Sequence, residues 1–219
     1  MITLYGFGRI FPEGIGETKD MRVEWALLEL ALPYRVHALD HTAGELDTEA
    51  YLKLSAFRQV PVIDDDGFVV SESGAILLYL AEKYRKLIPD DLQGRTHVMQ
   101  WCFAATTTVM PPLAELDMID AFDKNGELAE HRALWDGVAQ RFLGSLEQQL
   151  EARSWIAGAD FTVADILLAN VLRMLRRTKT LAAYPRLTDY YARAHARPAW
   201  RTALARYAER LGVDPATIS

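Results

Sequence analysis

Residues 58–73 are RQVPVIDDDGFVVSES, and this stretch decides the fold. Two short runs rich in valine flank Asp65-Asp66-Gly67. Because glycine accepts the positive φ that tight turns require, this pattern predicts a β-hairpin. Pro61 stands at the start of the first strand, where a backbone donor is not needed, and Ser71-Glu72-Ser73 opens the next periodic segment. The stretch therefore predicts a strand hairpin that runs directly into a helix.

The same stretch carries a candidate ligand site. A cis bond before Pro61 would turn the backbone N–H and C=O of Val60 outward, where they can pair with an extended peptide. Glu72 and Ser73 stand at a predicted helix N-terminus, whose free amides and dipole favour a carboxylate. The Ser73 hydroxyl can donate to that carboxylate, and Glu72 can accept from an ammonium group. Each piece alone is also explained as a cap or a strand start, but together they predict a site for a short peptide with a free α-amino-acid end.

The first eighty residues, outward from this stretch, alternate strand and helix signals. Residues 2–5 and 34–38 are rich in β-branched and aromatic side chains, which is typical of strands. Residues 21–30 repeat apolar side chains at the spacing of one helix face, and 48–54 and 71–84 are further predicted helices. This order predicts a small mixed sheet with helices on both faces.

The strand signal ends after about residue 91. Four later segments have helical spacing: 96–109, 131–152, 163–177 and 187–194. We therefore expect an α/β domain over 1–85, a linker over 86–92 and an all-helical domain over 93–219.

One sharp local signal lies in the helical part. Thr162 can cap the first turn of a helix, and Asp165, three residues later, can reach back to the Thr162 amide. Phe161 and Ile166 can close the same turn as a hydrophobic staple. The pattern predicts the start of a buried helix, which is a structural role.

Composition excludes several classes of protein. Half of the 219 residues are hydrophobic and a quarter are charged, which is typical of a globular chain. No apolar run approaches the roughly 20 residues of a membrane helix, and the start lacks the basic and apolar regions of a signal peptide. The single Cys102 excludes an internal disulfide, and the five histidines are scattered, so we expect no metal site. A reducing cytoplasm is the expected location.

Charge is distributed unevenly along the chain. Residues 1–90 hold 9 basic and 15 acidic side chains, a net −6, whereas residues 170–219 hold 10 basic and 3 acidic ones, a net +7. The basic end can attract nucleic acid, or it can be a solvated helix face offset by the acidic first part. We favour the second interpretation, and no nucleic acid partner, because the basic residues are spread out with few aromatic neighbours.

A dinucleotide site must be considered because Gly6-Phe7-Gly8 follows a strand. The full G-x-G-x-x-G pattern requires glycine at position 11, which is Phe11, and no helix opens directly afterwards. We therefore expect no dinucleotide site.

The order of these motifs resembles the glutathione transferase superfamily, in its cytosolic, bacterial-like form. Val60-Pro61, Glu72-Ser73 and the capping stretch Thr162-Val163-Ala164-Asp165 carry the resemblance, which covers nearly the whole chain. It implies a thioredoxin-like N-terminal domain followed by an all-helical domain. It also implies glutathione as co-substrate, without a metal.

The resemblance implies roles for individual residues. Val60, before a cis Pro61, would pair with the cysteinyl backbone of glutathione. Glu72 and Ser73 would hold its γ-glutamyl end, and Gln59 would assist.

The group that activates the glutathione thiol is less evident. Lowering a thiol pKa from about 8.5 to 6.5 takes roughly 2.7 kcal/mol of thiolate stabilisation. In the family a donor hydroxyl and the N-terminus of the first helix supply it. Counting along the chain places Glu17 and Thr18 at the serine position of related proteins, and Tyr5 near the tyrosine position. We predict Thr18 and Tyr5 as catalytic candidates, with positive charge from Lys19 or Arg9 as the alternative.

The resemblance implies a dimeric, detoxifying transferase that adds the glutathione thiolate to small apolar electrophiles. Glutathione-dependent peroxide reduction at the same site is one alternative. A noncatalytic interaction module on the same fold is another, because fold does not fix function. Phe57 is expected to insert into the partner subunit of a homodimer, or else to be buried within its own subunit.

Overall fold

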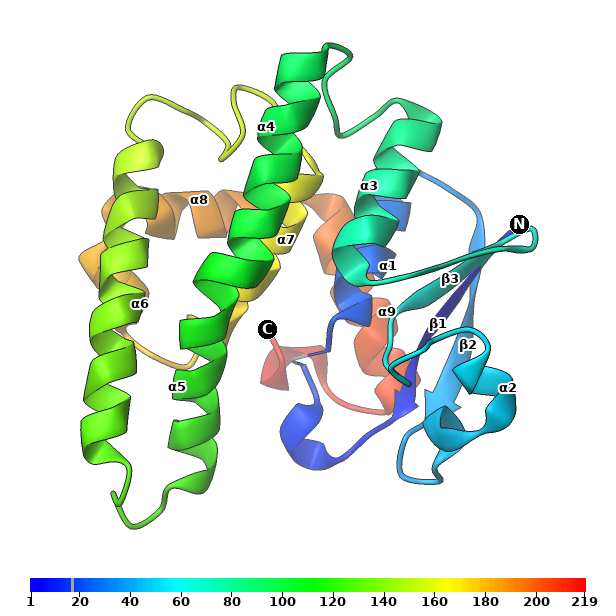
Figure 1. Cartoon of the computed structure of the whole chain (residues 1–219), viewed down its shortest axis with the longest axis horizontal. Coiled ribbons are helices and arrows are strands. Elements are labelled where there is room, and N and C mark those ends of the chain that lie inside the picture. Colours follow the sequence, from blue (N-terminus) through cyan, green and yellow to red (C-terminus); the bar gives the residue numbers. More distant parts are fainter. Residues whose placement is uncertain (17) are drawn as a thin grey trace. The chain divides into compact units, whose positions relative to one another are not determined.

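The computed structural model describes residues 1–16 and 18–219, so that Glu17 lies outside the described residues. A four-stranded sheet has the order β2-β1-β3-β4 (Figure 1). Its strands are β1 (Ile2–Arg9), β2 (Tyr34–Asp40), β3 (Val62–Asp65) and β4 (Phe68–Ser71). β1 pairs in parallel with β2 and antiparallel with β3, which pairs antiparallel with β4. The predicted hairpin and the mixed sheet are confirmed.

Helices cover both faces of this sheet. The helices are α1 (Asp20–Glu29), α2 (Glu49–Leu52) and α3 (Ser73–Tyr84). Alternate strand residues point to opposite faces, so Val62 packs with Tyr51 of α2, whereas the next residue, Ile63, points the other way and is fully buried. The expected thioredoxin-like arrangement is therefore present.

The last helix, α9 (Pro198–Leu211), packs along α1. The described chain accordingly forms two compact units, one made of residues 1–86 with 196–219 and the other of residues 87–195. The predicted boundaries place residues 93–219 in one helical domain, whereas the packing joins the last 24 residues to the sheet.

Close packing explains the two glycines that suggest a dinucleotide motif. A Cβ atom on Gly6 would lie 2.6 Å from Oδ2 of Asp20, and one on Gly8 would lie 2.7 Å from Cβ of Ala38. Both glycines therefore let β1 approach its neighbours closely, which is a packing role.

The second unit contains helices throughout. Its helices are α4 (Leu92–Phe103), α5 (Met110–Phe122), α6 (Ala129–Gln149), α7 (Val163–Leu172) and α8 (Pro185–His195). A π-helical segment, Ala104–Val109, joins α4 to α5. Pro111 and Pro112 follow it, and because proline has no N–H, the regular bonding pattern cannot continue through this point. The sequence pattern misses α5 and α9.

Short 3-10 turns complete the described chain. They are Pro12–Gly14, Glu45–Asp47, Arg173–Leu175, Thr180–Ala183 and Pro215–Thr217.

The predicted capping box at the start of α7 is confirmed. The Asp165 carboxylate accepts the Thr162 amide at 2.8 Å and the Thr162 hydroxyl at 3.0 Å. It also accepts the Ile156 amide at 2.8 Å and the Tyr190 hydroxyl at 3.0 Å. Burial raises the pKa of Asp165 in spite of these bonds. All ten residues of α7 are buried, as expected for a core helix.

Acidic residues of the first unit offset part of the basic C-terminal segment. Arg197 forms a two-pronged ion pair with Glu29, with N–O distances of 2.6 and 2.7 Å. Arg210 pairs with Asp20 at 3.1 Å and with Glu24 at 2.8 Å. These contacts favour the interpretation of an internally balanced charge.

Within residues 1–16 and 18–219, no helix combines the length and the apolar character needed to cross a membrane.

Candidate functional site

The loop before β3 is fixed by its own side chains. The Ser55 hydroxyl donates to the Gln59 carbonyl at 3.0 Å and accepts the Gln59 amide at 3.0 Å. The Tyr51 hydroxyl donates to the same carbonyl at 2.9 Å. Both backbone groups of Gln59 are thus satisfied inside the loop, while its side chain is exposed. This arrangement sets the direction of the next residue, Val60.

Val60 presents its backbone and buries its side chain. The Val60–Pro61 peptide bond is cis, as anticipated. The Val60 side chain is 8% exposed and packs with Leu39, Tyr51 and Val62. Among the described residues, neither its amide nor its carbonyl has a backbone or side-chain hydrogen-bond partner. One donor and one acceptor therefore stand ready for an extended ligand.

Glu72 and Ser73 form the junction between β4 and α3. Glu72 has φ 70° and ψ 116°, a conformation that non-glycine residues rarely adopt and that often marks functional sites. Its side chain is exposed. Ser73 is the first residue of α3 and is 5% exposed. The first turn of α3 also has backbone amides without a partner inside the helix, which are available to a ligand at this junction.

Arg22 of α1 orients the Ser73 hydroxyl through a hydrogen bond. Nη1 of Arg22 donates to Oγ of Ser73 at 3.3 Å. Because guanidinium can only donate, Ser73 acts as the acceptor in this bond, and its own proton stays available for a ligand carboxylate. Arg22 is 2% exposed, and burial lowers its pKa to about 10. The site thus has a buried cation that is hydrogen-bonded to its hydroxyl donor.

Lys19 adds a second cationic group at the N-terminal end of α1. Burial and the neighbouring Arg22 charge lower the pKa of Lys19, while the Glu72 charge acts in the opposite direction. A half-buried ammonium group in this position would be stabilised by an anionic ligand.

Several of these groups line a small pocket of the first unit. Its lining consists of Lys19, Ser55, Phe57, Gln59, Val60, Pro61, Ser71, Glu72 and Ser73. The residues that the resemblance implies for glutathione binding are all in this lining: Gln59, Val60, Pro61, Glu72 and Ser73. Neither Ser55 nor Arg22 is among the predicted site residues. The Ser55 side chain bonds to the backbone of Gln59, which no sequence motif indicates, and Arg22 contacts Ser73 across fifty-one positions.

The two predicted catalytic hydroxyls lie outside the lining of this pocket. Thr18 is 8% exposed, and its hydroxyl donates to Oη of Tyr207 at 3.0 Å. Tyr5 lies on the sheet, with ring centroids 5.0 Å from His37 and 6.2 Å from Tyr51. Glu17, the other residue at the serine position, lies outside the described residues.

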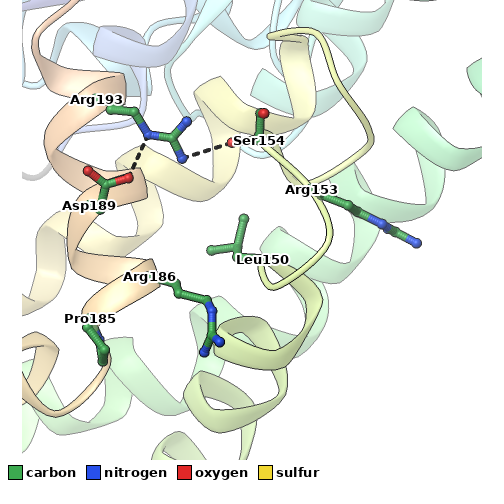
Figure 2. A pocket seen from close by; sticks show the side chains of 7 residues that line it. All are labelled: Leu150, Arg153, Ser154, Pro185, Arg186, Asp189 and Arg193. Carbon is green, nitrogen blue, oxygen red and sulfur yellow. Dashed lines mark hydrogen bonds and ion pairs between the residues drawn. The ribbon is translucent and has the colours of Figure 1, made fainter.

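A larger depression lies on the helical unit, between α6 and α8 (Figure 2). Arginine side chains dominate its lining, but each is engaged by the protein itself. Arg186 pairs with Glu147 at 3.3 Å and with Glu151 at 3.2 Å, and Arg193 pairs with Asp189 at 2.9 Å. Arg153 donates to the Ile156 carbonyl at 3.3 Å. Size alone therefore does not make this depression the candidate site.

The single cysteine has no signs of reactivity. Cys102 is 3% exposed, and burial together with the Asp165 charge raises its pKa to about 12. It is a packed thiol rather than a nucleophile. Across the described ranges 1–16 and 18–219, no cluster of three or more potential metal ligands is present.

Protein families match both parts of the chain. The glutathione S-transferase N-terminal domain matches residues 21–83, and the glutathione S-transferase C-terminal domain matches residues 117–208.

Individual relatives agree with this match. Glutathione S-transferase hmp2 of Hypomyces subiculosus is 32% identical over 203 residues, which cover 84% of this chain and 92% of that protein. The disulfide-bond oxidoreductase YfcG of Escherichia coli is 30% identical over 187 residues, covering 81% and 86%. A glutathione transferase family member from Pseudomonas fluorescens, crystallised with two glutathione molecules bound, is 26% identical with a TM-score of 0.81, covering 92% and 91%. From its fold, its pocket and these matches, the chain belongs to the glutathione S-transferase family.

Proposed function

We propose that the chain binds glutathione in the Val60–Ser73 pocket and transfers its thiolate to small apolar electrophiles. The observation that carries this proposal is the unpartnered Val60 backbone next to a Ser73 hydroxyl held by a buried arginine. A peptide with a carboxylate at one end matches this arrangement of donors.

Glutathione would lie extended across the pocket. Its cysteinyl backbone would pair with Val60, as an added strand does. Its γ-glutamyl carboxylate would accept from the Ser73 hydroxyl and from amides at the start of α3. The Glu72 carboxylate would accept from the α-ammonium group, and Gln59 would assist.

Thiolate stabilisation would come mainly from the start of α1. The helix N-terminus carries a partial positive charge, and Lys19 lines the pocket beside it. The hydroxyls of Thr18 and Tyr5 remain predicted donors, but that of Thr18 already bonds to Tyr207. We therefore rank Lys19 first among the side chains that lower the thiol pKa.

In the transfer step, the sulfur lone pair forms a bond to an electrophilic carbon. The electron pair displaced from that carbon departs with the leaving group, or it is protonated by water after addition. Orientation and electrostatic stabilisation would supply the rate enhancement.

Phe57 is 79% exposed, which removes the alternative that it is buried within its own subunit and supports a role as a contact in the proposed homodimer.

Calorimetric titration with reduced glutathione, in buffers of different ionisation enthalpy, tests this proposal. We expect binding with proton release near neutral pH. Ser73→Ala should weaken binding by between about tenfold and a hundredfold, since a hydrogen bond to a charged group contributes about 1.5–3 kcal/mol. Ser71→Ala, in the same pocket but outside the helix N-terminus, should bind nearly normally. Absence of binding by the unmodified protein would refute the proposal and favour an interaction module.

Glutathione-dependent disulfide reduction is a second candidate, favoured by the similarity to the Escherichia coli disulfide-bond oxidoreductase. Here the glutathione thiolate would attack one sulfur of a small disulfide, form a mixed disulfide and release the other sulfur as a thiolate. No protein thiol takes part, since Cys102 is buried and is the single cysteine of the sequence. Parallel assays with an aryl halide, a small disulfide and a hydroperoxide would separate transfer, disulfide reduction and peroxide reduction.

A further inference from the structure

A long connection joins β1 to α1, and it delivers Lys19 and the α1 N-terminus to the pocket. β1 ends at Arg9 and α1 begins at Asp20. Apart from the short 3-10 turn Pro12–Gly14, the described part of this connection has no regular structure. Its position therefore has to be set by contacts with other elements.

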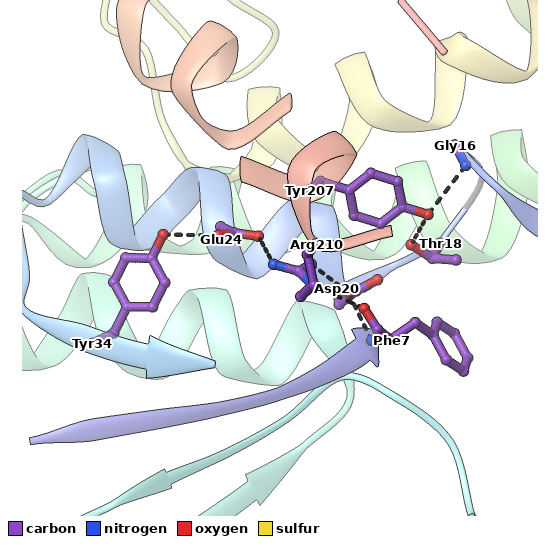
Figure 3. Close-up of polar contacts among 8 residues, drawn as sticks. All are labelled: Phe7, Gly16, Thr18, Asp20, Glu24, Tyr34, Tyr207 and Arg210. Atoms are coloured by element: carbon purple, nitrogen blue, oxygen red, sulfur yellow. Dashed lines mark hydrogen bonds and ion pairs between the residues drawn. The ribbon is translucent and has the colours of Figure 1, made fainter. Parts of the chain in front are cut away.

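Two side chains of α9 make several of these contacts, at the two ends of the connection (Figure 3). Tyr207 accepts the Gly16 amide at 3.1 Å and the Thr18 hydroxyl at 3.0 Å. Arg210 donates to the Phe7 carbonyl at 2.9 Å and to Asp20 at 3.1 Å. Residues 7 and 20 are also joined directly, because the Phe7 amide donates to Asp20 at 3.2 Å.

These contacts fasten the connection at both ends. Phe7 lies before it, Asp20 begins the helix after it, and Gly16 and Thr18 lie just before that helix. Tyr207 and Arg210 are three residues apart, so they project from the same face of α9. One helix face thus holds the entry and the exit of the connection.

Both α9 side chains are largely shielded from water. Tyr207 is fully buried, and burial raises its pKa to about 12, so its hydroxyl stays neutral at ordinary pH. The Arg210 side chain is 11% exposed, and it also bonds to Glu24 at 2.8 Å. Burial lowers the pKa of Arg210, but the charges of Glu24 and Asp20 outweigh this effect and raise it. The guanidinium group therefore stays charged.

We propose that Tyr207 and Arg210 are positioning residues for the glutathione thiol, acting through Gly16, Thr18 and Asp20 on the start of α1. The inference rests on the proposed function. Electrostatic stabilisation of a thiolate depends on where the helix amides and Lys19 lie relative to sulfur. A shift of Lys19 and Asp20 that leaves Arg22 bonded to Ser73 would therefore change thiol ionisation while the Val60 contact, which lies on another element, stays as it is.

The test compares Tyr207→Phe with Tyr190→Phe. Both tyrosines are fully buried and both hydroxyls are hydrogen-bonded, but Tyr190 bonds to Asp165 in the helical unit. The pKa of bound glutathione is followed by thiolate absorbance against pH, and the affinity for S-methylglutathione reports on the pocket without a thiol.

We expect Tyr207→Phe to raise the bound thiol pKa by about one unit, equal to a tenfold smaller thiolate fraction well below the pKa. Affinity for S-methylglutathione should stay within about twofold, which a general loss of structure would not preserve. Tyr190→Phe should change neither quantity. Arg210→Lys keeps a positive charge but cannot reproduce the three-way contact, so a smaller rise of the thiol pKa is expected.

Equal thiol pKa values in Tyr207→Phe and the unmodified protein would overturn the inference, as would equal shifts in both tyrosine variants. If Tyr207→Phe does not fold, an unchanged thiol pKa in Arg210→Lys has the same consequence. These outcomes leave the proposed function intact. Failure of the unmodified protein to bind glutathione would instead overturn the proposed function, and the inference with it.

Discussion

Asp165 in the helical unit and Asp20 in the first unit are both fully buried carboxylates, but they have different partners. In the described part of the chain, the hydrogen-bond donors to Asp165 are neutral, and two of them, Ile156 and Thr162, lie within nine residues of it. Asp20 lies with buried Glu24 against Arg210, 190 positions along the chain. The buried carboxylate of the helical unit is therefore stabilised mainly by local hydrogen bonds. The buried carboxylates of the first unit are stabilised by a cation from a distant part of the sequence.

The largest effect should follow loss of the distant cation. Arg210→Met would leave Asp20 and Glu24 buried without their shared positive partner. Breaking a buried ion pair from one side costs about 3–5 kcal/mol, and we expect a loss of that size in the free energy of unfolding. Urea unfolding measures it, with Arg201→Met on an exposed part of the same helix as control. A loss below about 1 kcal/mol would show that this ionic centre, formed by Arg210, Asp20 and Glu24, contributes little to stability.

Stability should depend somewhat less on the buried carboxylate of Asp165. Asp165→Ala removes four hydrogen-bond acceptor contacts and the capping box of α7. The four contacts come from neutral groups, so the substitution leaves no unpaired buried charge, and we expect a loss of about 3 kcal/mol. Asp160→Ala, at an exposed position five residues earlier, is the matched control. If both variants unfold at the same urea concentration, the capping box does not contribute to the free energy of unfolding.

A third effect depends on pH and is specific to the helical unit. The Nδ1–H group of His195 donates to the Tyr191 carbonyl at 2.8 Å, and burial, followed by the Arg173 charge, lowers the His195 pKa to about 3. The folded pKa of His195 lies below the unfolded value of about 6.5, so between these two values the unfolded chain binds a proton that the folded chain does not. The folded state therefore has its full stability above about pH 6.5 and loses stability as pH falls toward 3. At pH 5 the loss should be about 2 kcal/mol.

Unfolding curves at several pH values would measure this loss. His195→Gln cannot titrate, so its stability should fall less steeply below pH 6.5. His131→Gln, at an exposed position, should retain the steep fall. A His195→Gln profile parallel to that of the unmodified protein would contradict the assignment.

The same contrast between local and distant partners explains what the sequence could predict. The Val60–Pro61 corner, the Glu72-Ser73 junction and the Thr162–Asp165 box each depend on residues a few positions apart, and all three are confirmed as structural features. The fold class follows from these local signals and from the order of the strands.

The missed features depend on long-range contacts or on interrupted periodicity. The pairing of Thr18 with Tyr207 spans 189 residues, so no local pattern indicates that its hydroxyl is already engaged. The position of Arg22 beneath Ser73 spans 51 residues. Helix α5 begins next to Pro111-Pro112, and a proline pair by itself predicts a break in a helix. The segment with α9 joins the first unit through ion pairs of Arg197 and Arg210, which the composition shows only as a charge imbalance.

The smallest expected effect lies at the outer edge of the ionic centre. The Tyr34 hydroxyl donates to Glu24 at 2.9 Å and accepts from Arg206 at 2.8 Å. Burial and the Glu24 charge raise the Tyr34 pKa to about 12, so the phenol keeps its proton for this bond. Tyr34→Phe leaves Glu24 paired with Arg210, and exposed Arg206 can return to water, so we expect a loss of about 1 kcal/mol.

Combining Tyr34→Phe with Arg206→Met tests how the edge is connected to the centre. If Arg206 acts only through Tyr34, the double variant should be no less stable than Tyr34→Phe alone, apart from lost side-chain packing. A loss from Tyr34→Phe as large as that from Arg210→Met would contradict the comparison. It would mean that one neutral hydrogen bond determines the stability of the buried carboxylates as strongly as their cation does.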